Sequence, residues 1–354
     1  MTDTVLKQPD LGLADLAACR ALMRGGSKSF FAASRLLPAR LRAPATALYA
    51  FCRLADDAID EGDDATAAMG VLQRRLDAIY AGRPDAVDAD RALAHVVHRY
   101  GIPRALPDAL LEGFLWDSQG RRYQTLEDVE AYGARVAGTV GAMMALIMGT
   151  DSETALARAC ELGVAMQLTN IARDIGEDAR NGRLYIPRDW FADAGMDADQ
   201  WLRKPVFDER IASFTRRLLQ RADVLYQRGE CGVAELSWDC RPAIQAARLV
   251  YAEIGRQLER EGLNSVERRT VVSKPRKLYL IARATAVAVN APTVRAASMT
   301  PEPAIAYLVH AVTDAQGRMP RRQAWRIPQR NFEERVEWMV NLLGRLEERE
   351  RPAP

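Results

Sequence analysis

The stretch QLTNIARDIGED, residues 167–178, places an amide and two carboxylates at regular intervals in a partly apolar segment. In a helix, Asn170, Asp174 and Asp178 would be neighbours on one face, because residues four apart in sequence lie one above another. This stripe would extend roughly 12 Å along the helix axis. Like charges at this spacing destabilise a helix. We therefore expect a bound cation to offset the repulsion.

A second acidic segment, YAFCRLADDAIDEGDD at residues 49–64, lies more than a hundred residues upstream. Its Asp56 and Asp60 are also four residues apart and share a helix face. Carboxylate and amide oxygens are hard ligands that suit Mg²⁺, with Mn²⁺ as the alternative ion. Two facing stripes would hold several such ions, which would in turn bind a diphosphate. The competing interpretation is a pair of solvated helix faces.

Two further stretches offer groups for binding an anion. The segment SVERRTVVSKPRKLYLIARA, residues 265–284, gathers basic side chains around a predicted helix start, where anions are favoured. The segment GGSKSFFAASRLLP, residues 25–38, offers hydroxyl and ammonium donors, although a serine there also fits a helix N-cap. The candidates in these two stretches are Ser27, Lys28, Ser29, Phe30, Arg268, Lys274 and Arg276.

Composition restricts the class of protein. The chain has 354 residues, of which 48% are hydrophobic, so it can bury a substantial core in one large domain or two ordinary ones. A formal net charge of only +2 argues against a nucleic-acid partner. Five cysteines without a CxxC motif indicate reduced, packed thiols and a cytoplasmic location.

Helical periodicity dominates the chain, and strand alternation is hard to find. The three expected regions are a disordered N-terminus at 1–12, an all-α domain at 13–291, and a C-terminal extension at 292–354 that ends in an amphipathic helix packed on the same domain. Helices are predicted at residues 13–24, 38–61, 64–81, 88–100, 103–117, 125–149, 151–180, 207–228, 239–262, 274–290 and 331–349. Within the helix at 125–149, VAGTVGAMMALIMG supplies small residues that suit close helix packing.

In these motifs the chain resembles the head-to-head trans-prenyltransferases of the squalene and phytoene synthase family, and within it the bacterial phytoene synthases. The motifs occur in the family's order. They are GSKSF (26–30), ALYAFCRLADDAID (47–60), YGARVAGTVGAMM (132–144), QLTNIARDIGEDARNGRLYIP (167–187) and YAEIGRQLE…RRTVVSKPRKL (251–278).

The resemblance implies an all-α class I prenyltransferase fold, a helical bundle around a central cavity. It implies metal binding by Asp56, Asp60, Asn170, Asp174 and Asp178. It places Tyr132 and Tyr251 in the cavity near the reacting carbons. The substrate-binding residues that it implies are Ser27, Lys28, Ser29, Phe30, Arg53, Gln167, Arg173, Arg268, Lys274 and Arg276.

The implied reaction joins two geranylgeranyl diphosphates through cyclopropyl (prephytoene) diphosphate to 15-cis-phytoene, the first step of carotenoid biosynthesis. It needs Mg²⁺ and no NADPH. The implied partners are the cytoplasmic membrane face, contacted peripherally, and other carotenoid-pathway enzymes. A squalene- or diapophytoene-type synthase using farnesyl diphosphate is one alternative, and a non-enzymatic helical scaffold is another. A head-to-tail polyprenyl synthase or terpene cyclase would share the carboxylates.

Overall fold

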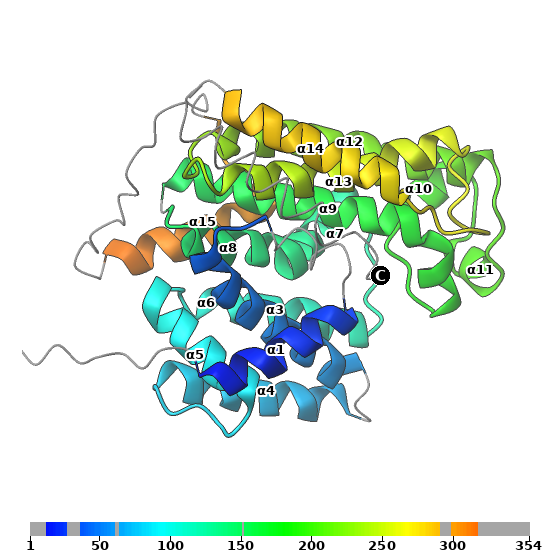
Figure 1. Cartoon of the computed structure of the whole chain (residues 1–354). Coiled ribbons are helices and arrows are strands. Elements are labelled where there is room, and N and C mark those ends of the chain that lie inside the picture. The colour runs from blue at the N-terminus through cyan, green and yellow to red at the C-terminus, as the bar shows by residue number, and fades with distance from the viewer. Residues whose placement is uncertain (1–11, 27–35, 61–63, 151, 291–298, 318–354) are drawn as a thin grey trace, which may run out of the picture.

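The computed structural model describes residues 12–26, 36–60, 64–150, 152–290 and 299–317. Within these ranges the chain is helical and has no strand, as the periodicity predicts (Figure 1). The helices are α1 (Leu13–Gly26), α3 (Ala39–Asp60), α4 (Ala65–Tyr80), α5 (Asp88–Tyr100), α6 (Ala105–Ser118), α7 (Leu126–Gly133), η1 (Ala134–Gly138), α8 (Thr139–Ile147), α9 (Glu153–Arg180), α10 (Arg188–Asp193), α11 (Ala198–Arg203), α12 (Glu209–Val233), α13 (Arg241–Arg260), α14 (Lys274–Asn290) and α15 (Pro303–Gly317).

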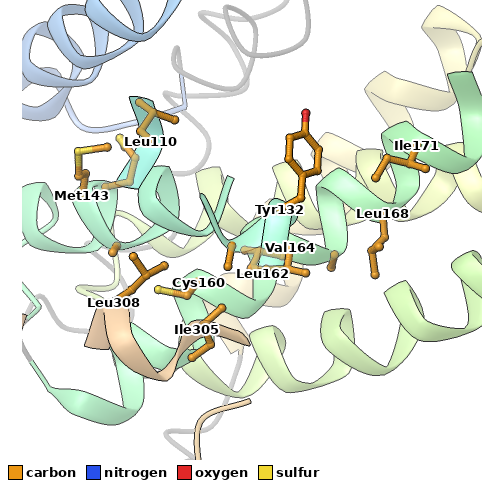
Figure 2. Close-up of a cluster of buried hydrophobic side chains, with 14 of the residues drawn as sticks. Leu110, Tyr132, Met143, Cys160, Leu162, Val164, Leu168, Ile171, Ile305 and Leu308 are labelled. Carbon is orange, nitrogen blue, oxygen red and sulfur yellow. The ribbon is translucent and has the colours of Figure 1, made fainter. Parts of the chain in front are cut away.

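The long helix α9 organises the bundle. It packs against α8, η1, α12, α13 and α15, while α3 packs with α1, α5 and α6 (Figure 1). One continuous apolar core joins these groups, and Figure 2 shows part of it, with Leu168 and Ile171 of α9 and Leu308 of α15 among its members. The acidic motif of α9 therefore has an apolar side that fixes the helix in the bundle.

Glycines allow α9 to approach its neighbours closely. A Cβ added to Gly141 of α8 would lie 2.2 Å from the carbonyl oxygen of Ala159, and one added to Gly163 of α9 would lie 2.3 Å from that of Ala137. Real Cβ atoms do not come so close to a backbone oxygen. Close helix packing therefore requires both glycines, although each also borders the cavity described below.

The predicted single helix at 125–149 is wrong in one respect. A π-helical turn, η1, interrupts it directly after Gly133. Helix α15 and the short helices α10 and α11 were not predicted at all. The predicted helix at 331–349 and the predicted disordered residues 1–11 lie outside the described residues.

The described part of the C-terminal extension is held to the bundle by charges. Glu302, just before α15, pairs with Arg221 at 2.6 Å and with Arg228 at 3.1 Å, both from α12. Arg228 also pairs with the buried Glu161 of α9 at 2.8 Å. Ile305 and Leu308 of α15 join the common core.

The state of the cysteines can also be compared with its prediction. All five cysteines are free thiols, as predicted. Among the described residues, every helix falls short of the length and apolar character that a membrane crossing requires.

Candidate active site

The predicted stripe on α9 is present. Asn170, Asp174 and Asp178 lie on one face of the helix and are all partly exposed, while Ile171 and Ile175 between them are buried in the core. Burial, followed by repulsion from Asp174, raises the pKa of Asp178 to about 7. Burial and the neighbouring Asp174 therefore disfavour the ionised form of Asp178.

The second stripe lies at the end of α3. Burial and then the nearby Asp60 raise the pKa of Asp56 to about 6. Arg53, one turn earlier, pairs with Asp57 at 2.5 Å and lies 3.6 Å from Asp56. The guanidinium that the resemblance assigned to a diphosphate therefore sits beside these carboxylates.

Arg183 connects the two stripes. It follows the end of α9 and donates to a carboxylate oxygen of Asp60 on α3 at 2.7 Å. Although burial opposes it, this hydrogen bond raises the pKa of Arg183 above its ordinary value. Arg183 also lowers the pKa of Asp178, which places its charge near both helices. The two acidic stripes thus border one common space.

Two more arginines hold Asp174. Arg173 donates to it from the neighbouring position, and Arg269 donates at 2.7 and 3.1 Å from the segment between α13 and α14. Burial opposes the effect, but these hydrogen bonds lower the pKa of Asp174 below its ordinary value. The segment can come this close because Gly176 has no side chain: a Cβ there would lie 2.0 Å from the carbonyl oxygen of Val266.

A cluster of tyrosines surrounds Asp117 at the end of α6. The hydroxyls of Tyr132 and Tyr185 each donate to one oxygen of this carboxylate at 2.6 Å. Their rings stack with centroids 5.1 Å apart, and Tyr123 lies 5.5 Å from Tyr132. Figure 2 shows Tyr132 pointing away from the apolar cluster around α9. Asp117 also adds to the negative charge felt by Asp56.

A cavity of about 790 Å³ lies beside the α9 stripe, between η1, α8, α9, α12, α13 and α14. Gln167, Asn170, Tyr251 and Lys274 line it among mostly apolar residues such as Met166. The position of Tyr251 fits the sequence-based prediction. Tyr132 does not line this cavity, because it faces Asp117 instead.

The basic candidates separate in the structure. Lys274 and Lys277 line the cavity. Arg268 instead donates to the backbone oxygen of Glu261 at 2.5 Å, and Arg276 pairs with the buried Glu253 at 2.9 Å. Residues 27–30, with Ser27, Lys28, Ser29 and Phe30, lie outside the described residues.

Sequence reasoning did not assign Asp117, Arg183 or Tyr185 to the site, and it included Arg269 only as part of the basic region at 268–277. Arg183 and Tyr185 were within reach, since they belong to the quoted GRLYIP motif. Arg269 was counted among the basic residues but not singled out. Asp117 carries no local signal, because only the folded chain brings it to the two tyrosines.

The donor set fits a hard divalent cation. Within the described ranges no three acidic, histidine or cysteine side chains converge into a closed metal site, and arginines lie against the carboxylates instead. However, burial and then neighbouring carboxylates raise the pKa values of Asp56 and Asp178, and the arginines do not fully offset these two effects. Oxygen ligands with excess negative charge are those that Mg²⁺ and similar ions prefer.

Comparison with known proteins identifies the family. A family model described as Squalene/phytoene synthase matches residues 23–276. The chain belongs to the squalene/phytoene synthase family. It is a prenyl transferase of the class that joins prenyl chains head to head in carotenoid biosynthesis. This family generally uses a divalent metal.

Relatives within the squalene/phytoene synthase family are close. A phytoene synthase of Cereibacter sphaeroides is 48% identical over 351 residues, which is 96% of this chain and 95% of that protein. One from Rhodobacter capsulatus is 52% identical over 84% of this chain and 90% of that protein. A crystal structure of a dehydrosqualene synthase with a ligand is 30% identical and superposes with a TM-score of 0.70, covering 77% of this chain and 96% of that one. The all-α isoprenoid synthase fold is therefore confirmed.

Proposed function

We infer that this chain is a phytoene synthase that condenses two molecules of geranylgeranyl diphosphate through a cyclopropyl diphosphate to 15-cis-phytoene. One observation supports this most strongly: an apolar cavity of about 790 Å³ adjoins a stripe of amide and carboxylate side chains. The apolar part suits long prenyl chains, and the acidic part suits the diphosphates with their cations. Relatives named phytoene synthase, at 48% and 52% identity, favour this product.

In this proposal the two stripes hold the metal. Asp56 and Asp60 form one set of ligands, and Asn170, Asp174 and Asp178 form the other. Mg²⁺, when bound there, neutralises the charge that develops on a departing diphosphate. Mn²⁺ has the same preference for oxygen ligands and is the alternative ion.

Basic and polar side chains around the stripes bind the diphosphates. Arg53, Arg173 and Lys274 line or adjoin the space beside the carboxylates. Gln167, also on the cavity wall, adds an amide donor. We assign Ser27, Lys28, Ser29 and Phe30, together with Arg268 and Arg276, to the same task. Arg268 and Arg276 must leave their present partners to reach a ligand.

The cavity would protect the carbocation that forms when a prenyl chain loses its diphosphate. Its mostly apolar wall excludes water, which would otherwise capture the cation. Aromatic faces attract a cation, and Tyr251 presents its ring to the cavity. In this proposal Tyr132, whose hydroxyl donates to Asp117, acts near the carboxylates and not on the cavity wall. The proposed reaction does not use NADPH.

The surroundings of the enzyme follow from the substrate and product, which are very apolar. We propose a cytoplasmic protein that contacts the cytoplasmic membrane face peripherally and associates with other enzymes of the carotenoid pathway. Nucleic acid is not among the proposed partners.

The test is product analysis. Purified protein is supplied with geranylgeranyl diphosphate and Mg²⁺ but no NADPH, and the extracted products are identified by chromatography and mass spectrometry. We expect phytoene, and no product after Asp174→Ala. A parallel reaction with farnesyl diphosphate tests the fifteen-carbon alternative. Faster turnover of farnesyl diphosphate, or no turnover of either substrate, would contradict the proposal.

A further inference from the structure

Exposed apolar side chains gather on and beside α14. Among the described residues, eight large hydrophobic side chains are clearly exposed, and four of these are Val271, Leu278, Tyr279 and Val287. Val271 is 70% exposed and Tyr279 is 55% exposed. Single exposed hydrophobic residues are ordinary, but a group of them marks an interaction site.

The pattern on α14 is that of a helix with two apolar sides. Pro275, Leu278, Tyr279 and Ala282 are all exposed and follow an i, i+3, i+4, i+7 spacing, so they form one stripe. On another side, Leu280 and Ala284 are fully buried. Helix α14 packs mainly on α13 and lies along the upper edge of the molecule in Figure 1. The exposed stripe therefore faces away from the bundle.

Basic residues are in excess around this stripe, although Arg269 pairs with Asp174 and Arg276 with Glu253. Residues 268–290 contain six lysines and arginines and no acidic residue. Lys274 and Arg283 are exposed beside the apolar stripe. Nearby, the buried Glu253 accepts from both Arg260 and Arg276, so a single carboxylate is shared by two guanidiniums that reach the surface. An apolar stripe flanked by basic residues is typical of helices that lie in the interface of an anionic membrane.

Helix α14 is also a wall of the cavity. Lys274, Lys277, Leu278 and Ile281 line that space. Leu278 belongs to both surfaces, because it is 44% exposed and also borders the cavity. The exposed apolar stripe and the cavity therefore meet at Leu278.

We propose that the outer face of α14, formed by Val271, Tyr279, Arg283 and Val287 around the exposed stripe, docks on an anionic lipid bilayer. Prenyl chains then pass between the bilayer and the cavity along this helix. The identity of the prenyl chains rests on the proposed function, whereas the docking of α14 on the bilayer does not. The exposed Arg283 and Lys274, with no acidic residue in 268–290, favour anionic lipid headgroups over an apolar protein partner.

Flotation with vesicles tests the docking. The full-length protein is mixed at low salt with vesicles of phosphatidylcholine and phosphatidylglycerol, or of phosphatidylcholine alone. The apolar variant combines Val271→Ser, Tyr279→Ser and Val287→Ser. Its matched control changes three exposed valines on other elements, Val71→Ser, Val206→Ser and Val224→Ser. The charge variant is Arg283→Glu, with Arg216→Glu on the exposed side of α12 as its control.

We expect the wild type and both controls to float with the anionic vesicles only. The apolar variant should lose flotation. Arg283→Glu should weaken the partition at least about fivefold, the factor that corresponds to about 1 kcal/mol for each basic residue near an anionic surface. Turnover of geranylgeranyl diphosphate in detergent micelles should stay the same in all variants. If turnover fails in the wild type, the proposed function is wrong, while flotation still judges the docking.

Three results would overturn the proposal. The first is a wild type that does not float, or that floats equally well with neutral vesicles. The second is equal loss of flotation in the variants and their controls. The third is self-association of the wild type that the apolar variant abolishes without any change in flotation, since this would assign the face to a second copy of the chain.

Discussion

Asp117 shows how a residue outside the acidic motifs can control the site. Its carboxylate accepts one hydroxyl from Tyr132 and one from Tyr185, so it sets where both rings point. Asp117→Asn keeps the size but replaces one acceptor by a donor. Loss of one hydrogen bond to a charged group costs about 1.5–3 kcal/mol, which predicts a roughly tenfold to hundredfold fall in kcat. KM should change little, because Asp117 does not line the cavity.

A double-mutant cycle distinguishes positioning from general damage. If Asp117 acts through Tyr132, Asp117→Asn combined with Tyr132→Phe should be no slower than the slower single variant. Tyr185→Phe removes only the second donor and should have a smaller effect than Asp117→Asn. Multiplicative losses in steady-state kcat would show that the two residues act independently.

Asp178 allows a prediction about stability and pH. Its folded-state pKa is about 7, against an ordinary value of 3.8, because it is buried and faces Asp174. A raised carboxyl pKa means that ionisation destabilises the folded protein above the unfolded pKa, fully so above the folded one. Asp178→Asn should therefore raise the Tm of metal-free protein at pH 8, with the gain fading between about pH 7 and pH 4.

The measurement is thermal unfolding in chelator across this pH range. Activity should be lost in the same variant, because a proposed metal ligand is missing. Asp199→Asn is the control, since Asp199 pairs with Arg188 and has a lowered pKa, so its replacement should not raise Tm at pH 8. An unchanged or lower Tm of Asp178→Asn at pH 8 would refute the account of repulsion.

Among the individual site residues, the sequence predicted those that recur at helical spacing. The α9 stripe could be read from spacing alone, because one helix determines it. Arg183 on Asp60 and Arg269 on Asp174 could not, because each pair joins residues about a hundred positions apart. The positions of Arg268 and Arg276 depend on Glu261 and Glu253, which only the folded chain brings to them.

At the scale of the helices, close packing depends on Gly141 and Gly163. Substitution of Gly163 tests how tightly α9 packs on η1. Gly163→Ala adds a methyl group 2.3 Å from the backbone oxygen of Ala137, which cannot turn away. Overpacking costs about 1–3 kcal/mol, more than the roughly 1 kcal/mol that alanine gains over glycine in a helix. Tm should fall by a few degrees.

Gly70→Ala is the matched control for this change. Its added Cβ would meet only the end of the Arg74 side chain, at 3.7 Å. The propensity gain should then remain, and Tm should rise slightly. Calorimetry of the two variants should give shifts of opposite sign, and a stabilised Gly163→Ala would show that α9 and η1 are not packed so tightly.

The helices themselves were predictable in number and position where apolar residues recur over several turns. The turn η1 was not, because a π-helical insertion leaves the apolar pattern of its helix nearly unchanged. Helix α15 was missed because prolines and polar residues surround it in sequence. Its place is determined by distant partners, above all the arginines of α12 that bind Glu302.

For the whole molecule, the proposed site lies between two parts of the bundle, one around α3 and the other around α9. A ligand that binds both stripes should stabilise the folded state, by about 2.7 kcal/mol at a hundred times its Kd. Mg²⁺ with inorganic diphosphate should therefore raise Tm. The shift should vanish in Asp56→Ala and in Asp174→Ala. The same shift in either variant, measured by differential scanning fluorimetry, would place the ligand elsewhere.

Under the proposed function, the pair between Arg183 and Asp60 would give the empty enzyme a resting state. If diphosphate leaves with its cations, as proposed, the facing acidic stripes keep only their arginine partners. The Arg183 guanidinium already lies between them, and its half-exposed pair with Asp60 at 2.7 Å is of a kind worth only about 0–1 kcal/mol. This pair is therefore weak enough for the next substrate to replace it, and the helices need not rearrange when it breaks.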